Sequence, residues 1–219
     1  MSKPLMVHVI TNFAGVGGAE MMLARLIQYT EHQYEHVIIA LMKTSEVYQS
    51  TLDRCQAHYA LDWNGINTLG TVSKLRTLLK KLQPATVQCW MYHANVLTSL
   101  SIIGLAQKPK VVWGIHHSLA SPKDESISTK IALGLSKILS QQASAIIYCA
   151  HSSMQQHQVF GFKNANSQVI ANGVFLDKFQ PNPQLHEPTV IGFAGRYHIV
   201  KGYPYLFETM VLLLDIIII

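Results

Sequence analysis

The sequence is short of acidic residues. Its 219 residues include 12 Asp and Glu against 17 Lys and Arg, which gives a formal net charge of +5, and 11 His can add to this charge in acid. This excess of positive charge favours anionic partners, among them nucleotide phosphates, anionic lipid surfaces and nucleic acid. Nucleic acid is set aside because no nucleic-acid-binding motif accompanies the charge.

Cysteine is also scarce. Cys55, Cys89 and Cys149 are far apart, odd in number and free of C-x-x-C spacing, which excludes a disulfide framework and a zinc site and fits a reducing cytosol. The start of the sequence lacks the pattern of a signal peptide, and no apolar run reaches membrane-spanning length. We therefore expect a cytoplasmic protein.

Two familiar nucleotide-binding motifs are missing. No G-x-x-x-x-G-K-[ST] occurs, which excludes a nucleotide-hydrolysing P-loop. A dinucleotide-binding G-x-G-x-x-G would need a third glycine where Glu20 stands, and Met42-Lys43 follows the second expected strand in place of an acidic ribose partner. Hydride transfer with a nicotinamide cofactor is therefore disfavoured.

Apolar runs of strand length alternate with longer helical patterns along the whole chain. Hydrophobic residues make up 49% and charged residues 13%, which excludes disorder. The alternation predicts an α/β fold with a doubly wound parallel sheet. The expected strands are 7–11, 36–41, 58–61, 86–89, 110–115, 145–149 and 168–170, and the expected helices are 18–29, 46–54, 66–82, 93–106, 130–141 and 152–160.

The chain divides into one complete domain and the start of another. Residues 1–180 are expected to form the first domain, and the Pro-rich segment 181–188 a linker. Residues 189–219 then supply a strand at 189–195 and a helix from about 202 to 214. Because one βα unit cannot build a parallel sheet, we expect 189–219 to be the opening of a truncated second domain.

A glycine-rich turn after the first strand is the first candidate site. Gly15, Gly17 and Gly18 precede Glu20 at the start of the first helix. Glycines let a ligand approach the backbone, and free N–H groups at a helix start attract phosphate or sugar oxygens. The alternative is a tight turn without a ligand.

The second candidate site is His116, which follows the strand at 110–115. Ligands of open α/β sheets bind at the carboxyl ends of the strands, so His116 is placed to reach a substrate. The alternative is a structural imidazole. His93, which follows the fourth strand, is a similar but weaker candidate.

Arg196 and Lys201 form the third candidate site, in the sequence Gly195-Arg196 to Lys201-Gly202. Two cations between a strand and a helix suit a diphosphate whose charge grows as a sugar leaves. The alternative is a solvated loop.

Together these segments resemble family four of the glycosyltransferases, the retaining enzymes with two facing Rossmann-like domains (the B-type fold). The G-G-x-E turn corresponds to Gly17 to Glu20, the histidine after a strand to His116, and a serine after the sixth strand to Ser152. The I-x-N-G-V-x-x-x-x-F motif corresponds to residues 170–179, and the G-R-x-x-x-x-K-G motif to 195–202.

The resemblance implies transfer of a sugar from a nucleotide-sugar donor to a glycan or lipid-linked acceptor, with retained configuration and without a metal or other cofactor. Arg196 and Lys201 would hold the donor diphosphate, and His116 would be the catalytic residue near the reacting sugar. The turn of Gly15, Gly17, Gly18 and Glu20 would face the phosphates or the acceptor. His93, Asn95 and Ser152 would lie on the acceptor side. The implied setting is bacterial polysaccharide or lipopolysaccharide assembly.

The family's donor-binding glutamate pair and its final helix have no counterpart in these 219 residues, so we expect very low activity from this chain alone. A non-catalytic module that binds an acceptor or a protein partner is the alternative. A further interpretation is a peripheral contact with the inner membrane face through four cations on one expected helix: Lys74, Arg76, Lys80 and Lys81. The alternative is that this basic helix face is only solvated.

Overall fold

The computed structural model describes residues 3–174, 176, 193–195, 197 and 201–217. They belong to two units, Met1–Val174 and Phe175–Ile219, and each unit is described by itself. The predicted linker at 181–188 lies outside the described residues.

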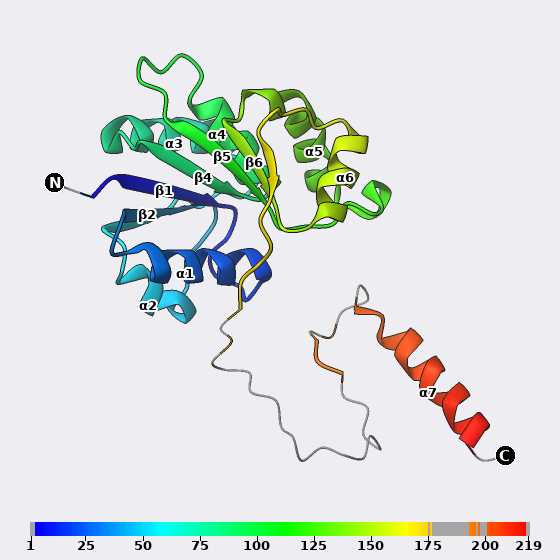
Figure 1. Cartoon of the computed structure of the whole chain (residues 1–219). Helices are drawn as coiled ribbons and strands as arrows, with labels where there is room; N and C mark the ends of the chain where they lie inside the picture. The colour runs from blue at the N-terminus through cyan, green and yellow to red at the C-terminus, as the bar shows by residue number, and fades with distance from the viewer. Residues whose placement is uncertain (1–2, 175, 177–192, 196, 198–200, 218–219) are drawn as a thin grey trace. The chain divides into compact units, whose positions relative to one another are not determined.

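Seven parallel strands form the sheet of the first unit (Figure 1), in the order β3-β2-β1-β4-β5-β6-β7. They are β1 (Leu5–Ile10), β2 (Glu35–Ala40), β3 (Ala57–Ala60), β4 (Thr86–Trp90), β5 (Lys110–Ile115), β6 (Ala145–Tyr148) and β7 (Ser167–Val169). The predicted doubly wound parallel sheet is confirmed. The order reverses at β1, which pairs with both β2 and β4.

Six α-helices connect the strands: α1 (Gly18–Thr30), α2 (Gln49–Leu52), α3 (Thr68–Leu82), α4 (Tyr92–Ser101), α5 (Ile127–Leu139) and α6 (His151–Phe160). Three 3-10 turns accompany them, at Glu46–Tyr48, Pro122–Asp124 and Ser140–Gln142. The helix predicted at 46–54 is divided between the first of these turns and α2. Ser45 caps that turn, since its hydroxyl accepts a hydrogen bond from the Val47 N–H.

The prediction that the fourth helix continues to residue 106 is wrong, because α4 ends at Ser101. The Arg76 guanidinium donates hydrogen bonds to the carbonyls of Ser101 (3.0 Å) and Ile103 (2.5 Å), which satisfies acceptors that the helix end leaves free. Gly104 then turns the chain with φ of +71°. Arg76 therefore has a structural role that the sequence did not indicate.

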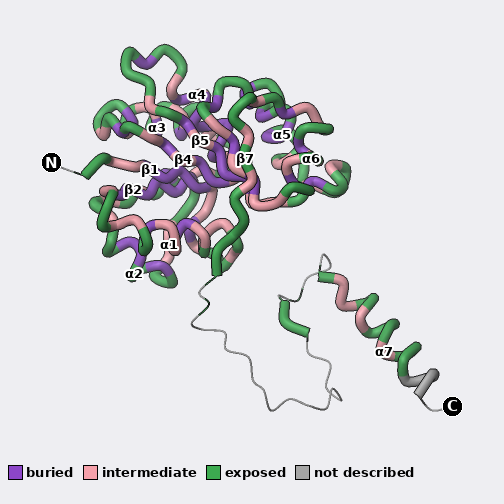
Figure 2. Tube along the Cα trace, in the orientation of Figure 1, coloured by how far each residue is buried: buried purple, intermediate pink, exposed green. Residues whose placement is uncertain are grey.

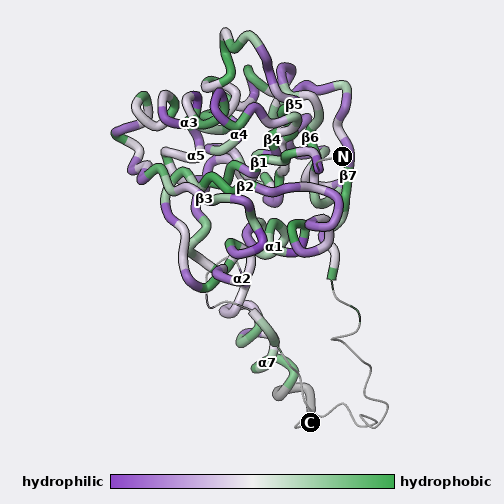
Figure 3. Tube along the Cα trace, turned by 90° about the vertical axis from the view of Figure 1, so that its left-hand side faces the viewer, coloured by the Kyte–Doolittle hydropathy of each residue, from purple (hydrophilic) through white to green (hydrophobic). Residues whose placement is uncertain are grey.

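The strands are mostly buried (Figure 2). Successive residues of a strand point to opposite faces of the sheet, so both faces contribute to the core. Val7 and Val9 of β1 belong to the larger core, which also includes residues of α3, α4 and α5. Ile10 belongs to a smaller core with Leu23 and Ile27 of α1. Hydrophobic segments follow the strands through the centre of the unit (Figure 3). Each of these fully buried aliphatic side chains stabilises the fold by roughly 1.5–3 kcal/mol.

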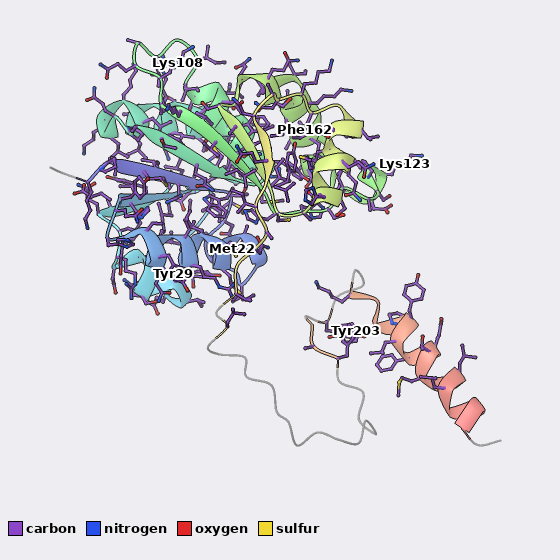
Figure 4. The ribbon with its side chains drawn as sticks, viewed as in Figure 1. Met22, Tyr29, Lys108, Lys123, Phe162 and Tyr203 are labelled. Atoms are coloured by element: carbon purple, nitrogen blue, oxygen red, sulfur yellow. The ribbon has the colours of Figure 1, made fainter. Side chains whose placement is uncertain are left out.

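Parallel strands place all their carboxyl ends at one edge of the sheet. Lys108 and Lys123 mark the loops at the two ends of β5 (Figure 4), with Lys123 on the carboxyl side. In open α/β sheets, ligands bind at that edge and close to the strand where the order reverses. The turns after β1, β4 and β5 therefore position the site.

The described part of the second unit includes the α-helix α7 (Tyr203–Ile217), which confirms the helix predicted from about residue 202. The Tyr203 hydroxyl donates a hydrogen bond to the Gly195 carbonyl (2.6 Å), and the rings of Phe193 and Tyr203 meet edge to face. The strand predicted at 189–195 lies mostly outside the described residues.

Candidate functional site

The glycine-rich turn between β1 and α1 is fixed by contacts with the neighbouring chain segment. The Phe13 N–H donates to the Lys43 carbonyl (2.8 Å), and the Phe13 ring stacks on Tyr48 with 4.1 Å between ring centroids. The Tyr48 hydroxyl donates to the Gly15 carbonyl (3.1 Å). Burial raises the pKa of this hydroxyl, so it remains a donor at neutral pH. These contacts hold the turn in place, and there is open space beside Gly15 and Gly18.

The carboxylate of Glu20 folds back over the start of α1. A Cβ added to Gly17 would lie 2.4 Å from Glu20 Oε2, so the carboxylate rests directly against the Gly17 backbone. A negative charge at a helix N-terminus is favourable, but it repels a second anion at the same place. The turn consequently suits the hydroxyl groups of a sugar better than it suits a phosphate.

His116 lies at the carboxyl end of β5 and is oriented on three sides. Its Nδ1 is 3.1 Å from Asn172 Oδ1, and its ring stacks on Trp90 with 5.1 Å between centroids and 17° between planes. Its backbone N–H donates to Met91 Sδ (3.3 Å). The motif that contains Asn172 was noticed in the sequence, but its contact with His116 was not predicted.

The protonation state of His116 follows from these contacts. Burial lowers its pKa, and the hydrogen bond with Asn172 opposes that shift, so the ring is neutral at pH 7. Because the Asn172 Oδ1 atom only accepts, Nδ1 of His116 carries the proton. Its Nε2 is then unprotonated and can accept a hydrogen bond from a sugar hydroxyl.

The turn between β4 and α4 is strained where it meets β5. Met91 has φ of +72°, which is uncommon for a residue with a side chain, and its N–H donates to the Gly114 carbonyl (2.9 Å). A Cβ on Gly114 would lie 3.2 Å from the Cys89 carbonyl and 3.4 Å from His116 Nε2. These close approaches favour a glycine at position 114, since a larger residue would push on the Cys89 carbonyl or on the His116 ring.

A series of hydrogen bonds runs from Trp90 of β4 through His8 and His36 to Thr30 of α1. The indole N–H of Trp90 can only donate, so it donates to His8 Nδ1 (3.4 Å). His8 Nε2–H then donates to His36 Nδ1 (3.0 Å), and His36 Nε2–H to the Thr30 hydroxyl (3.1 Å). His8 is 0% exposed, and burial lowers its pKa from 6.5 to about 3. These hydrogen bonds were not predicted from the sequence.

The predicted acceptor-side residues occupy different environments. His93 lies in the first turn of α4, with its Nε2 2.8 Å from the Ser128 hydroxyl and its ring 5.1 Å from that of Trp63. Ser152 is exposed in the first turn of α6. Asn95 is 0% exposed, so its side chain does not face a ligand at the surface.

Lys201 is exposed, and Gly202, with φ of +71°, separates it from the first residue of α7, Tyr203. The first N–H groups of a helix and a nearby ammonium form an anion-binding arrangement. Arg196, the other predicted diphosphate ligand, lies outside the described residues.

Two observations bear on metals and membranes. Among the described residues, no group of three or more His, Cys, Asp or Glu side chains is arranged to hold a metal ion. No helix in the described part of the chain combines the length and hydropathy needed to span a membrane.

Comparison with protein families shows that the family model of Glycosyltransferase Family 4 matches residues 16–178. No curated protein sequence matches the chain.

Several solved structures share its fold. Anabaena HepE in complex with UDP-glucose is 16% identical, with a TM-score of 0.63 over 81% of this chain and 46% of that one. The lipopolysaccharide outer core galactosyltransferase WaaB is 13% identical, with a TM-score of 0.63 over 84% and 50%. A UDP-N-acetylglucosamine 2-epimerase from Rickettsia bellii is 12% identical, with a TM-score of 0.55 over 78% and 45%. The chain thus spans about half the length of the structures it matches.

Proposed function

Since the chain belongs to glycosyltransferase family 4, we propose that it takes part in transferring a sugar from a nucleotide-sugar donor, with retained configuration, to a glycan or lipid-linked acceptor. The observation that carries the proposal is the neutral, oriented His116 at the carboxyl edge of the sheet. The HepE complexes with UDP and UDP-glucose support a nucleotide-sugar donor.

Each part of the site has a separate task in this proposal. Arg196 and Lys201 bind the donor diphosphate and offset the negative charge that develops on it as the sugar leaves, so no metal ion is required. His116 accepts a hydrogen bond from the reacting sugar through Nε2. The glycine turn, with the Glu20 carboxylate against it, receives acceptor hydroxyls and not the phosphates.

The diphosphate assignment predicts a loss of nucleotide affinity in two single variants. Arg196→Ala and Lys201→Ala should each weaken UDP binding at least about tenfold, because a hydrogen bond to a charged group contributes roughly 1.5–3 kcal/mol. Isothermal titration of the chain with UDP measures this, and Lys43→Ala, an exposed lysine of the first unit, is the matched control. Unchanged affinity in both variants would contradict the assignment.

The non-catalytic alternative makes a different prediction for turnover. A transferase releases UDP from UDP-glucose faster when an acceptor glycan is added, whereas an acceptor-binding module binds the glycan without release of UDP. The shared fold does not decide between the two readings, because proteins of different activity have it, as the match to a UDP-N-acetylglucosamine 2-epimerase shows.

We also propose a peripheral contact with an anionic membrane at the cytoplasmic face. Helices α3, α4 and α5 carry six Lys and Arg and no acidic residue. Lys74, Lys80 and Lys81 of α3 are exposed, whereas Arg76 is held by the carbonyls at the end of α4.

Charge reversal tests this contact. The triple variant with Lys74, Lys80 and Lys81 changed to Glu should lose most of its co-sedimentation with phosphatidylglycerol vesicles, since each cation near an anionic surface contributes about 1 kcal/mol. Phosphatidylcholine vesicles are the neutral control. Equal sedimentation of the variant and the parent chain would rule the contact out.

A further inference from the structure

The chain that follows β7 crosses the carboxyl edge of the sheet as an exposed segment. Residues 170–174, which we call the crossing segment, run from β7 past the ends of β6 and β5 to α1 (Figure 1). All five residues are exposed, so burial of side chains contributes little to the placement of the segment. Its position therefore depends mainly on hydrogen bonds.

Hydrogen bonds join the crossing segment to three elements of the first unit. The Ile170 N–H donates to the last carbonyl of β6 (2.9 Å), and Nδ1 of His116 donates to Asn172 Oδ1 (3.1 Å). The Arg25 guanidinium of α1 donates to the Gly173 carbonyl. The contact with His116 thus lies between two others, one at β6 and one at α1.

Arg25 extends from a firmly placed helix. Leu23 and Ile27 of α1 are 0% exposed and pack in the smaller core, so the backbone on either side of Arg25 is fixed. Arg25 itself is half-buried, and its Nη1 also lies 3.8 Å from Met22 Sδ. A hydrogen bond from a guanidinium to a carbonyl is charge-assisted and stronger than one between neutral groups. Arg25 is therefore suited to hold the exposed backbone at Gly173.

Gly173 makes the crossing segment dependent on this hydrogen bond. Glycine has more backbone freedom than any other residue, so its ordering costs the most conformational entropy. Asn172 adjoins Gly173, and without a hydrogen bond at the Gly173 carbonyl this freedom would let the Asn172 amide leave the imidazole. A Cβ at Gly173 would meet no atom within 4 Å, so crowding does not require a glycine here.

We propose that Arg25 is a positioning residue for His116. By holding the Gly173 carbonyl, it keeps the Asn172 amide in hydrogen-bond contact with Nδ1 of the imidazole. Nε2 of His116 then stays unprotonated and can accept a hydrogen bond from a sugar hydroxyl. This inference rests on the role of His116 in the proposed transferase function. Within that function, Arg25 acts through the crossing segment and not through a contact with the sugar.

Nitrogen-15 NMR of the whole chain at pH 7.5 tests the proposal, because it distinguishes a protonated ring nitrogen from an unprotonated one. The signals of His116 are those that His116→Gln removes. Arg25→Met keeps the aliphatic stem and the helix propensity but removes the donors. It should lower the ratio of the Nδ1–H to the Nε2–H form of His116 at least about threefold, within the range of one hydrogen bond. Arg54→Met is the matched control and should leave the ratio unchanged, because the exposed Arg54 pairs with Glu31.

Two double variants show whether Arg25 acts through the crossing segment. In the Asn172→Ala chain, Arg25→Met should change the ratio no further, because the contact through which Arg25 acts is already lost. Gly173→Ala reduces the backbone freedom of the segment and meets open space, and the φ of Gly173 lies outside the left-handed region. Added to Arg25→Met, it should therefore raise the ratio again by about two- to fivefold.

The contrary results are equally defined. The proposal would be overturned by a parent-like ratio in Arg25→Met, by an equal change in Arg54→Met, or by additive effects of Arg25→Met and Asn172→Ala. A parent chain with mainly the Nε2–H form of His116 would overturn it as well. Release of UDP from UDP-glucose by the parent chain keeps the two proposals apart. A shifted ratio without UDP release would support the role of Arg25 and contradict the transferase function, whereas release with an unshifted ratio would contradict the role of Arg25 alone.

Discussion

Acidification from pH 6.5 toward pH 3 is expected to remove about 5 kcal/mol of unfolding free energy through one side chain, His8. In the folded chain His8 is 0% exposed, and burial, assisted by neighbouring His36, lowers its pKa from 6.5 to about 3. Between these values the unfolded chain binds a proton that the folded chain does not bind. The contribution of His8 is therefore complete above pH 6.5, falls as the pH falls, and is lost by pH 3.

The variant His8→Gln isolates this effect. The Gln side chain can accept a hydrogen bond from the Trp90 N–H and donate one to His36, but it does not titrate. We expect the variant to be less stable than the parent chain at pH 7.5, by roughly 1–2 kcal/mol for imperfect hydrogen bonds, and at least as stable at pH 4. Urea unfolding across this pH range measures the crossing of the two curves.

His58→Gln is the control for the loss of a histidine, because His58 is exposed on β3. Its stability curve should run parallel to that of the parent chain. If the curve of His8→Gln were also parallel at every pH, His8 would not be the group that carries the acid sensitivity.

The strands were predictable because their side chains obey a local rule. A buried parallel strand needs a short apolar run, and each of the seven strands predicted in the first unit lies within two residues of an observed one. The end of α4 was not predictable in the same way, because it depends on Arg76, which is remote in sequence and donates to the last carbonyls of the helix.

The site was only partly predictable, for a related reason. His116 was identified from its place after a strand, and this uses only local sequence. Its partner Trp90 comes from β4 and its partner Asn172 from the segment after β7, and the contact of His8 with His36 depends on how β1 and β2 align in the sheet. The alignment of strands that are distant in sequence is determined by the tertiary fold. Residues that act through such contacts therefore cannot be identified from one sequence alone.

Trp90 is expected to determine both the stability of the first unit and the environment of His116. Its indole is 2% exposed, donates to His8 and stacks on the imidazole of His116. Trp90→Leu should cost somewhat less than the roughly 3–5 kcal/mol that truncation of a buried Trp to Ala costs, because Leu fills part of the space. It should also let water reach His116, whose pKa is held down by burial, so that this pKa rises toward 6.5.

Trp113→Leu separates these two effects. Trp113 is 0% exposed on neighbouring β5, but it packs against Phe162 in the larger core and not against His116. The two variants should lose similar stability in urea, whereas NMR titration should show a raised His116 pKa in Trp90→Leu alone. Trp90→Phe, which keeps an aromatic face and loses the N–H, should preserve most of the low pKa. An equal rise in the Trp113 variant would mean that general loosening of the fold, and not the stacked indole, sets the protonation of His116.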